Sequence, residues 1–199
     1  NPDLILSVDI YPKAIIEDEP YKLKEMNEII DQLIIMAYDF TQSGSCNAGP
    51  IAPVRTDSSL NEKIRDNYSI MQALEAAENK IDKEKLILGI PLYGYKWRTY
   101  DDKHRTKTYP GIGEMTSYSM MKELIKEKDL VISWDPLAQS PWTVYQEGWG
   151  FSQIYFENME SLKAKFDLAK EHQLKGIAFW ALGYEGKEKD FWEYLKKSF

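Results

Sequence analysis

A phenol and a carboxylate stand side by side at the end of one apolar run in this sequence. The run is Leu33–Phe40 (LIIMAYDF), in which five apolar residues without alternation precede Tyr38 and Asp39. A tyrosine hydroxyl can donate a hydrogen bond to a substrate oxygen, and an aspartate can accept one from a hydroxyl or an amide N–H. The structural alternative is that Tyr38 packs on a neighbouring element and Asp39 caps the next turn. The elements that position the two residues therefore matter.

The composition narrows the chemistry open to these residues. The 199-residue chain is 43% hydrophobic, enough for one substantial domain, and its formal net charge of −7 argues against a nucleic-acid partner. The single cysteine, Cys46, permits no internal disulfide, and His104 and His172 have no metal-ligand spacing. The sequence has no run of about 18 apolar residues, so we predict no membrane span. We also expect neither a metal nor a cofactor. The 6 Trp and 13 Tyr residues suit either sugar binding or packing.

Short apolar segments separated by amphipathic patterns predict alternating strands and helices. The predicted strands are Leu4–Ile10, Leu33–Phe40, Leu86–Leu92 and Gly176–Leu182. The predicted helices are Tyr21–Gln32, Leu60–Ile81, Ser161–Gln173 and Lys189–Phe199. This order favours parallel pairing, so the expected fold class is α/β.

The interval between the third and fourth predicted strands, Tyr93–Lys175, is far longer than one crossover connection requires. Within it we predict a helix at Thr116–Lys128 and short strands at Leu130–Trp134 and Trp142–Gln146. These elements indicate a small α+β insertion at Tyr95–Tyr155. An independent open sheet of flavodoxin type is an alternative, but it calls for a ligand-binding turn at a strand end, and no phosphate-binding turn follows the first strand.

Several motifs in the right order resemble the C-terminal half of family 18 glycoside hydrolases, the chitinase-like TIM barrels. Met36–Phe40 (MAYDF) looks like the family's M-x-Y-D motif on the sixth barrel strand. Leu86–Trp97 (LILGIPLYGYKW) looks like the seventh strand, and Gly176–Gly183 (GIAFWALG) looks like the eighth. The resemblance implies a partial (β/α)8 barrel of strands five to eight, beginning with Leu4–Lys13, with a small α+β insertion after the seventh strand. It divides the chain into barrel residues 1–94, an insertion domain at 95–155, and barrel residues 156–199.

A narrower resemblance is to bacterial spore-cortex and LysM-associated peptidoglycan glycosylases. It rests on Gly49–Val54 (GPIAPV), Ala138–Tyr145 (AQSPWTVY) and the long stretch Tyr155–Glu185. It implies a retaining, substrate-assisted hydrolase of glycans containing N-acetylglucosamine, with peptidoglycan favoured over chitin. The resemblance also implies a secreted parent protein, associated with the cell wall or the spore. The sequence itself gives no compartment.

The family's catalytic signature, D-x-x-D-x-D-x-E, does not occur in these 199 residues, and neither does its S-x-G-G motif. The last Glu of that signature is the family's general acid, so we expect both motifs upstream of Asn1 and an inactive fragment here. A half barrel leaves two sheet edges open, which favours self-association or coverage by another segment. A lectin-like relative that binds glycans without cleaving them is the alternative function.

The resemblance also assigns roles to residues near the strand ends. Tyr38 and Asp39 would position the acetamido group of the reacting sugar, and Trp180 would form the hydrophobic floor beneath it. Met36 and Tyr93 would line the same pocket. For Tyr38, Asp39 and Trp180, packing and turn capping are the competing interpretations.

Other candidates lie in or beside the insertion. Trp97 and Glu157 complete the expected substrate-binding set, and Trp134 and Trp142 are further candidate platforms for sugars. Core packing competes for each tryptophan, and a solvated or helix N-terminal charge competes for Glu157. Chitinases often carry an arginine where this chain has Tyr95, which puts an arginine contact there in doubt.

Overall fold

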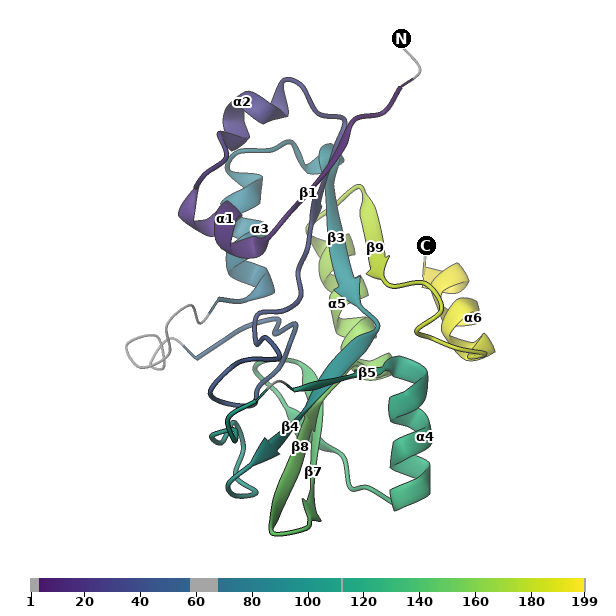
Figure 1. Ribbon diagram of the computed structural model, residues 1–199. Helices are drawn as coiled ribbons and strands as arrows, with labels where there is room; N and C mark the ends of the chain where they lie inside the picture. Colours follow the sequence, from purple (N-terminus) through teal and green to yellow (C-terminus); the bar gives the residue numbers. More distant parts are fainter. Residues whose placement is uncertain (1–3, 58–67, 112, 199) are drawn as a thin grey trace.

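The structure is a computed structural model that describes residues 4–57, 68–111 and 113–198, and its elements confirm the expected α/β class (Figure 1). The strands are β1 (Ser7–Ile10), β2 (Gln32–Ile35), β3 (Leu86–Pro91), β4 (Tyr93–Thr99), β5 (Glu114–Ser117), β6 (Ser133–Asp135), β7 (Ser140–Glu147), β8 (Gly150–Tyr155) and β9 (Gly176–Trp180). The helices are α1 (Pro12–Glu17), α2 (Leu23–Asn27), α3 (Ile70–Glu78), the 3-10 turn η2 (Lys83–Lys85), α4 (Tyr118–Lys128), α5 (Met159–Glu171) and α6 (Lys189–Ser198).

Four strands form a parallel sheet in the order β1-β2-β3-β9. The strand β3 is almost entirely buried, whereas the residues of β9 are only half-buried and Trp180 at its end is exposed. Inner strands of a parallel sheet are covered on both faces, so their sequences are continuous apolar runs. This explains why the sequence indicated strands at β2 and β3. Among the described strands β1 and β9 do not pair with each other, so the sheet is not closed into a barrel.

Five antiparallel strands form a second sheet in the order β5-β4-β8-β7-β6. Only Leu92 separates β3 from β4, so the chain passes directly from the first sheet into the second. The second sheet lies beyond the carboxyl ends of the parallel strands, with α4 beside it (Figure 1). A Cβ at Gly94 would lie 2.0 Å from the Tyr155 carbonyl oxygen, so the close approach of β4 to β8 requires glycine.

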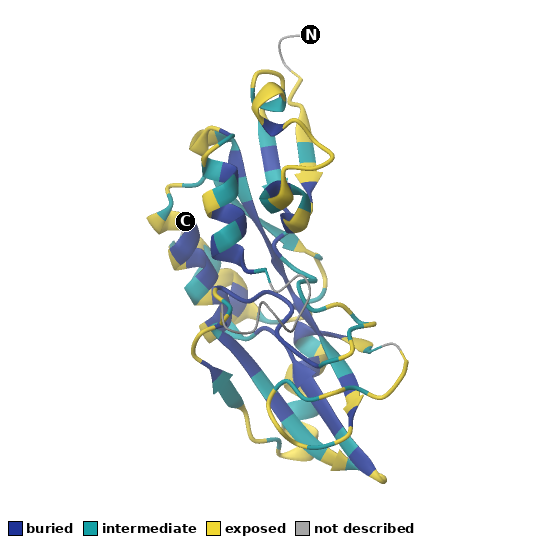
Figure 2. Cartoon of the chain, turned by 90° about the vertical axis from the view of Figure 1, so that its left-hand side faces the viewer, coloured by how far each residue is buried: buried dark blue, intermediate teal, exposed yellow. Residues whose placement is uncertain are grey.

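The helices α3 and α5 contribute their apolar faces to the main core, which Figure 2 shows as a band of buried positions through both sheets. Side-chain caps define where these helices begin. Ser69 accepts from the N–H of Gln72 at the start of α3, and Asn158 and Ser161 form a reciprocal capping box at the start of α5.

Several predicted boundaries were wrong. The strand expected at Leu33–Phe40 ends at Ile35 because the chain then turns through short bonds from the N–H of Ala37 and of Tyr38 to the carbonyls of Ile35 and Met36. The strand expected from Leu4 begins at Ser7, and the helix expected at Tyr21–Gln32 covers only Leu23–Asn27. The strands expected at Gly176–Leu182, Leu130–Trp134 and Trp142–Gln146 are Gly176–Trp180, Ser133–Asp135 and Ser140–Glu147.

Some predictions fall partly outside the described residues. Of the helix predicted at Leu60–Ile81, residues 60–67 are not described, and the described part forms α3. Asn1 and Phe199 also lie outside the described residues. The strands β4, β5 and β8 and the helix α1 were not predicted, and the helix predicted at Thr116–Lys128 begins at Tyr118, after β5. Glycine and polar residues interrupt β4 and β8, which hid their alternation.

Candidate active site

Asp39 lies at the centre of a hydrogen-bonded cluster where β2 has ended and β4 begins. The hydroxyl of Tyr93 donates to Asp39 Oδ1 at 2.6 Å, and the hydroxyl of Tyr95 donates to the same oxygen at 3.2 Å. Asp39 has φ 58°, in the left-handed region that aspartate tolerates better than most residues. The tight turn after β2 thus aims the carboxylate at β4 rather than along the strand.

Tyr38 connects this cluster to the end of β9. Its ring meets Tyr93 edge-on at 6.3 Å between centroids and lies 6.5 Å from Trp180. A Cβ at Gly89 would lie 2.6 Å from the Ile35 carbonyl oxygen and 3.3 Å from Tyr38 Cε1, so glycine lets Tyr38 lie against β3. The structure therefore brings Tyr38, Asp39, Tyr93 and Trp180 together at the carboxyl ends of three neighbouring strands.

The tyrosines of the cluster stay protonated at neutral pH. Burial, together with the nearby Asp9, Tyr11 and Asp39, raises the pKa of Tyr38 to about 12. Burial and Asp39 also raise the pKa of Tyr95 to about 12, and burial together with the Asp39 hydrogen bond raises the pKa of Tyr93 well above its ordinary value. Each phenol is consequently a neutral hydrogen-bond donor.

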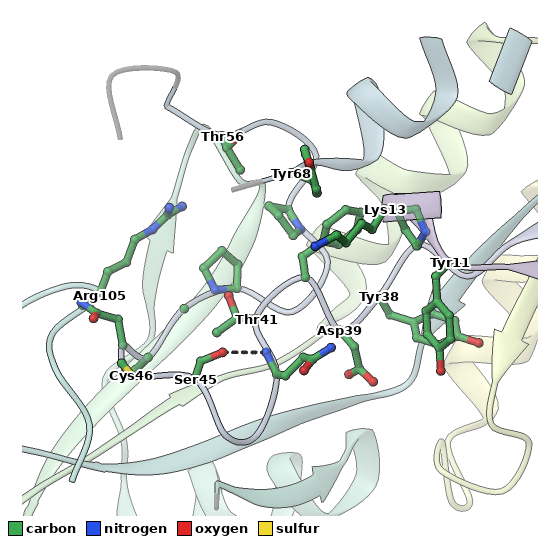
Figure 3. Close-up of a pocket in the computed structure, with 18 of the residues that line it drawn as sticks. Tyr11, Lys13, Tyr38, Asp39, Thr41, Ser45, Cys46, Thr56, Tyr68 and Arg105 are labelled. Carbon is green, nitrogen blue, oxygen red and sulfur yellow. Dashed lines mark hydrogen bonds between the residues drawn. The ribbon is translucent and has the colours of Figure 1, made fainter. Parts of the chain in front are cut away.

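A cavity of about 790 Å³ opens beside Asp39. The start of α1, the loop from Tyr38 to Pro50, and Arg105 from the loop after β4 line it (Figure 3). Tyr38 and Tyr11 lie at one end in this view and Arg105 at the other, with Asp39 between them. Trp180 is 56% exposed, and it is not among the described residues that line this cavity.

The remaining predicted site residues lie elsewhere or in the core. Trp97 is 2% exposed and its indole N–H donates to the Ser43 carbonyl at 2.9 Å, which favours packing over a sugar platform. Glu157 is also 2% exposed and pairs with Lys165 at 2.8 Å. Met36 is half-buried just beyond β2, with its N–H bonded to Ile10. The Trp97 ring packs against Tyr95 of the Asp39 cluster, with 5.6 Å between ring centroids, whereas these observations give Glu157 and Met36 no contact with the cluster.

The other two candidate tryptophans lie in the antiparallel sheet. Trp142 stacks on the buried Tyr155, with 5.9 Å between ring centroids and 16° between planes. Trp134 is half-buried on β6. Both positions fit packing within the sheet.

The sequence reasoning missed the roles of Tyr95 and Arg105. Tyr95 stands two residues after Tyr93 on β4, and residues two apart on a strand face the same side, so a correct prediction of β4 would have placed both hydroxyls together. Arg105 had no such signal, because it reaches the cavity through a loop whose course depends on long-range contacts.

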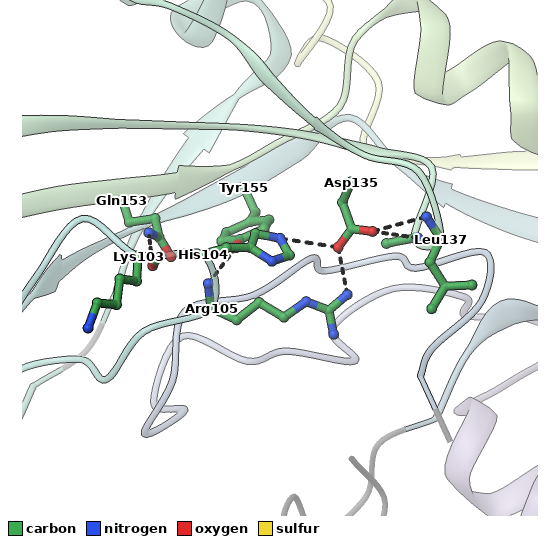
Figure 4. Close-up of polar contacts among 8 residues, drawn as sticks. Lys103, His104, Arg105, Asp135, Leu137, Gln153 and Tyr155 are labelled. Carbon is green, nitrogen blue, oxygen red and sulfur yellow. Dashed lines mark hydrogen bonds and ion pairs between the residues drawn. The ribbon is translucent and has the colours of Figure 1, made fainter. Parts of the chain in front are cut away.

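Arg105 belongs to a second polar cluster, in the antiparallel sheet (Figure 4). Its Nη2 donates to Asp135 Oδ2 at 2.7 Å, and His104 Nε2 lies 3.2 Å from the same oxygen. Burial alone would raise the pKa of Asp135, but hydrogen bonds from His104, from the N–H of Ala138 and from Arg105 hold it well below its ordinary range. Asp135 is therefore a stable anion that holds both side chains in place.

Two kinds of feature are absent from the described residues. Within residues 4–57, 68–111 and 113–198, no helix is long and apolar enough to cross a membrane. The same part of the chain holds no group of three or more His, Cys, Asp or Glu side chains arranged to bind a metal ion.

Comparison with curated proteins identifies relatives in Bacillus species. The chain is 28% identical over 171 residues to the cortical fragment-lytic enzyme of Bacillus subtilis (strain 168), covering 83% of this chain and 34% of that protein. It is 24% identical over 184 residues to the cortical fragment-lytic enzyme of Bacillus anthracis, covering 91% of this chain and 37% of that protein. The chain thus spans about a third of the length of these curated relatives.

Solved structures share the fold. The spore cortex-lytic enzyme SleL of Bacillus megaterium superposes with a TM-score of 0.73 at 25% identity, covering 100% of this chain and 42% of that one. The class V chitinase of Nicotiana tobaccum superposes with a TM-score of 0.79 at 18% identity, covering 94% and 53% respectively. The profile of "Glycosyl hydrolases family 18" matches residues 1–185. The chain belongs to glycosyl hydrolases family 18.

Proposed function

We propose that this chain forms one wall of the sugar site of a retaining, substrate-assisted glycoside hydrolase that acts on glycans containing N-acetylglucosamine. The observation that carries the proposal is the cluster at Asp39. A carboxylate held by the hydroxyls of Tyr93 and Tyr95 stands beside the rings of Tyr38 and Trp180. Such a site combines an acceptor, neutral donors and an apolar ring face, which are the groups that recognise an acetamido sugar.

In this proposal the four parallel strands are strands five to eight of a (β/α)8 barrel, and residues 1–94 and 156–199 are its barrel portions. The antiparallel sheet with α4 is the insertion, assigned to residues 95–155. The position of the cluster supports this arrangement, because the active sites of such barrels lie at the carboxyl ends of the strands.

In the proposed reaction the acetamido oxygen of the substrate forms a bond to the anomeric carbon of its own sugar while the glycosidic C–O bond breaks. The leaving oxygen takes its proton from a general acid that these 199 residues do not supply. The Tyr38 hydroxyl donates to the acetamido oxygen and orients it for attack. Asp39 accepts from the acetamido N–H and stabilises the positive charge that develops on the ring formed with that group. Tyr93 and Tyr95 keep Asp39 in position. Trp180 packs against the apolar face of the same sugar.

The chain alone should bind glycan without hydrolysing it, since the D-x-x-D-x-D-x-E signature that carries the family's general acid is absent from the 199 residues. Loss of a general acid costs roughly 10²–10⁴-fold in rate. The second candidate is a non-catalytic, lectin-type function, which would use the same contacts of Tyr38, Asp39 and Trp180 with a sugar. Peptidoglycan is the preferred polymer over chitin, because the bacterial relatives named above are cortex-lytic proteins.

The test is a binding and turnover experiment on the 199-residue chain. Calorimetry with a tetramer of N-acetylglucosamine should detect binding that Trp180→Ala weakens, whereas Trp149→Ala, the same change at a fully exposed tryptophan, should not. Product analysis should find no cleavage of the tetramer or of peptidoglycan. Absence of binding would refute the proposed site, and clear turnover would refute the assignment of the general acid to the missing signature.

We also propose that the outer strands β1 and β9 leave edges that favour self-association or coverage by another segment. The exposed apolar residues beside them, Leu4, Ile5 and Leu182, support this. Light scattering should then give a mass above that of one 23.2 kDa chain, and the mass of a compact monomer would contradict self-association.

A further inference from the structure

The cavity beside Asp39 ends at a charged residue that the proposed reaction does not use. Its charged lining residues are Lys13, Glu17, Glu19, Asp39 and Arg105. Of these, only Arg105 comes from the antiparallel-sheet half of the chain, and Figure 3 shows it at the end remote from Tyr11 and Tyr38. Arg105 and Asp39 thus line the same cavity at different places along it.

Arg105 is held in place from several directions. Its Nη2 donates to the buried Asp135 at 2.7 Å, and its backbone N–H donates to the Tyr155 hydroxyl at 3.0 Å. Its carbonyl accepts from Asn47 Nδ2 at 2.9 Å. Asn47 lies in the loop that follows Asp39, so the position of Arg105 is tied to that of the reacting centre. A preorganised donor loses little conformational entropy when a ligand binds.

The hydrogen-bonding capacity of Arg105 is not used up by these contacts. A guanidinium has five N–H donors, and among the described residues only Nη2 has a side-chain partner, which is Asp135. Its Nε is buried and has no partner among the described residues. Asp135 in turn accepts from the N–H groups of Leu137 and Ala138 and contacts His104, so its charge is shared among several donors. The guanidinium can therefore accept a further anionic partner.

The charges elsewhere in the cavity restrict where such a partner can bind. Lys13 lies 3.9 Å from Glu17, which also accepts from the Tyr68 hydroxyl at 2.7 Å. Glu19 and Asp39 also line the cavity, so the lining residues from the parallel-sheet half of the chain include three carboxylates and one lysine. An acidic group would be repelled by these carboxylates and attracted to Arg105.

We infer that Arg105 is a specificity residue that recognises a carboxylate carried by the glycan, on a sugar or substituent next to the one held at Asp39. The inference rests on the proposed function and narrows it to an acidic glycan. Asp135 is a positioning residue that orients the guanidinium. The carboxylate has two possible sources with the same chemistry: a lactyl group on the sugar or a peptide attached to it.

The experiment compares three glycans of matched length by calorimetry on the 199-residue chain. One is the neutral tetramer of N-acetylglucosamine, one is a peptide-free peptidoglycan tetrasaccharide with free lactyl carboxylates, and one is the same tetrasaccharide with peptide stems. Arg105→Gln should lower affinity for the source that is recognised about tenfold, as expected for one hydrogen bond between charged groups. It should change affinity for the neutral tetramer less than about twofold.

Control variants separate recognition from folding. Arg98→Gln makes the same change at an exposed arginine on β4 that pairs with Glu147 at 3.1 Å, and it should leave all three affinities unchanged. Asp135→Asn should lower the affinity for the acidic glycan, as Arg105→Gln does. Arg105→Lys keeps the charge but loses the planar fork, so it should retain part of the affinity for the acidic glycan. If circular dichroism shows that Arg105→Gln is unfolded, Arg105→Lys takes its place in the experiment.

Each outcome decides between the two levels of the proposal. If the neutral tetramer binds, and Arg105→Gln lowers the affinities for all three glycans equally or changes none of them, the inference is overturned while the proposed sugar site stands. If no glycan binds the unmodified chain, the proposed site and the inference fail together. A loss of affinity for one acidic glycan alone supports the inference and identifies the source of the carboxylate.

Discussion

Asp39 and Glu157 are two carboxylates that follow strands, and the chain treats them in opposite ways. Asp39 is half-buried at the edge of a cavity and accepts hydrogen bonds from two neutral phenols. Glu157 is 2% exposed, is paired with the fully buried Lys165 at 2.8 Å, and accepts from the Ser161 hydroxyl at 2.5 Å. Both were candidate sugar contacts, but only Asp39 is near open space.

The two carboxylates differ in the charge of their partners, and this difference distinguishes a structural carboxylate from a functional one. Burial raises the pKa of Glu157, and Lys165 and Ser161 act in the opposite sense, so this carboxyl depends on its partners inside the protein. The phenols around Asp39 are neutral and can share their hydrogen bonds with a ligand at small electrostatic cost. The expected consequences of mutation therefore differ: loss of stability at Glu157 and loss of ligand affinity at Asp39.

The largest expected effect follows removal of the partner of Glu157. Lys165→Met should lower the free energy of unfolding by about 3–5 kcal/mol, because it leaves a buried carboxyl without its countercharge. Urea denaturation measures this change. Lys163→Met is the matched control, since Lys163 is exposed and pairs with the exposed Asp167, and it should cost about 0–1 kcal/mol.

A double variant sharpens this prediction. Changing Glu157 and Lys165 together to Met removes both charges and should recover much of the loss, because an apolar pair of similar volume often replaces a buried ion pair without penalty. Equal destabilisation by Lys165→Met and Lys163→Met would show that the buried pair has no special role in stability.

The second expected effect is on binding. Asp39→Asn should lower affinity for the neutral tetramer about tenfold, because it replaces a charged acceptor with a neutral amide. It should change the free energy of unfolding by less than about 1 kcal/mol, since asparagine tolerates the same backbone conformation. Asp129→Asn is the matched control, with φ 50° at the end of α4 and no contact with the cavity. Equal affinities for the two variants would contradict the role given to Asp39.

The inner strands and the pair Tyr38–Asp39 could be predicted because their signals are local. Parallel strands buried on both faces read as apolar runs, and a polar pair at the end of such a run stands out. The resemblance of short motifs then connected three strand ends that lie far apart in the sequence. The structure agrees in bringing Tyr38, Asp39, Tyr93 and Trp180 together.

Other features depend on contacts that the sequence does not display. The end of β2 at Ile35 reflects a turn, not a change in hydrophobicity, and β4 pairs with β8 across more than fifty residues. The burial of Glu157 depends on Lys165, eight residues later and on a different element. The position of Arg105 depends on the contacts of its loop with Asn47 and Tyr155. Each of these follows from tertiary pairing rather than from local pattern.

The smallest expected effect tests the neutral donors themselves. Tyr95→Phe removes the longer of the two hydrogen bonds to Asp39, at 3.2 Å, and should weaken glycan binding by only about two- to threefold. Its pH dependence is more informative. Burial, with Asp39, raises the pKa of Tyr95 from 10.0 to about 12.

Between pH 10 and 12 the folded chain keeps a proton on Tyr95 that the unfolded chain releases, so the stability contributed by this phenol is complete below pH 10 and falls as the pH rises towards 12. Urea denaturation over this range should therefore show a shallower decline in Tyr95→Phe than in the unmodified chain. Tyr21→Phe, at an exposed position outside the cavity, is the matched control. An unchanged slope in Tyr95→Phe would mean that its hydroxyl ionises as freely in the fold as in the unfolded chain, and that Tyr93 alone holds Asp39.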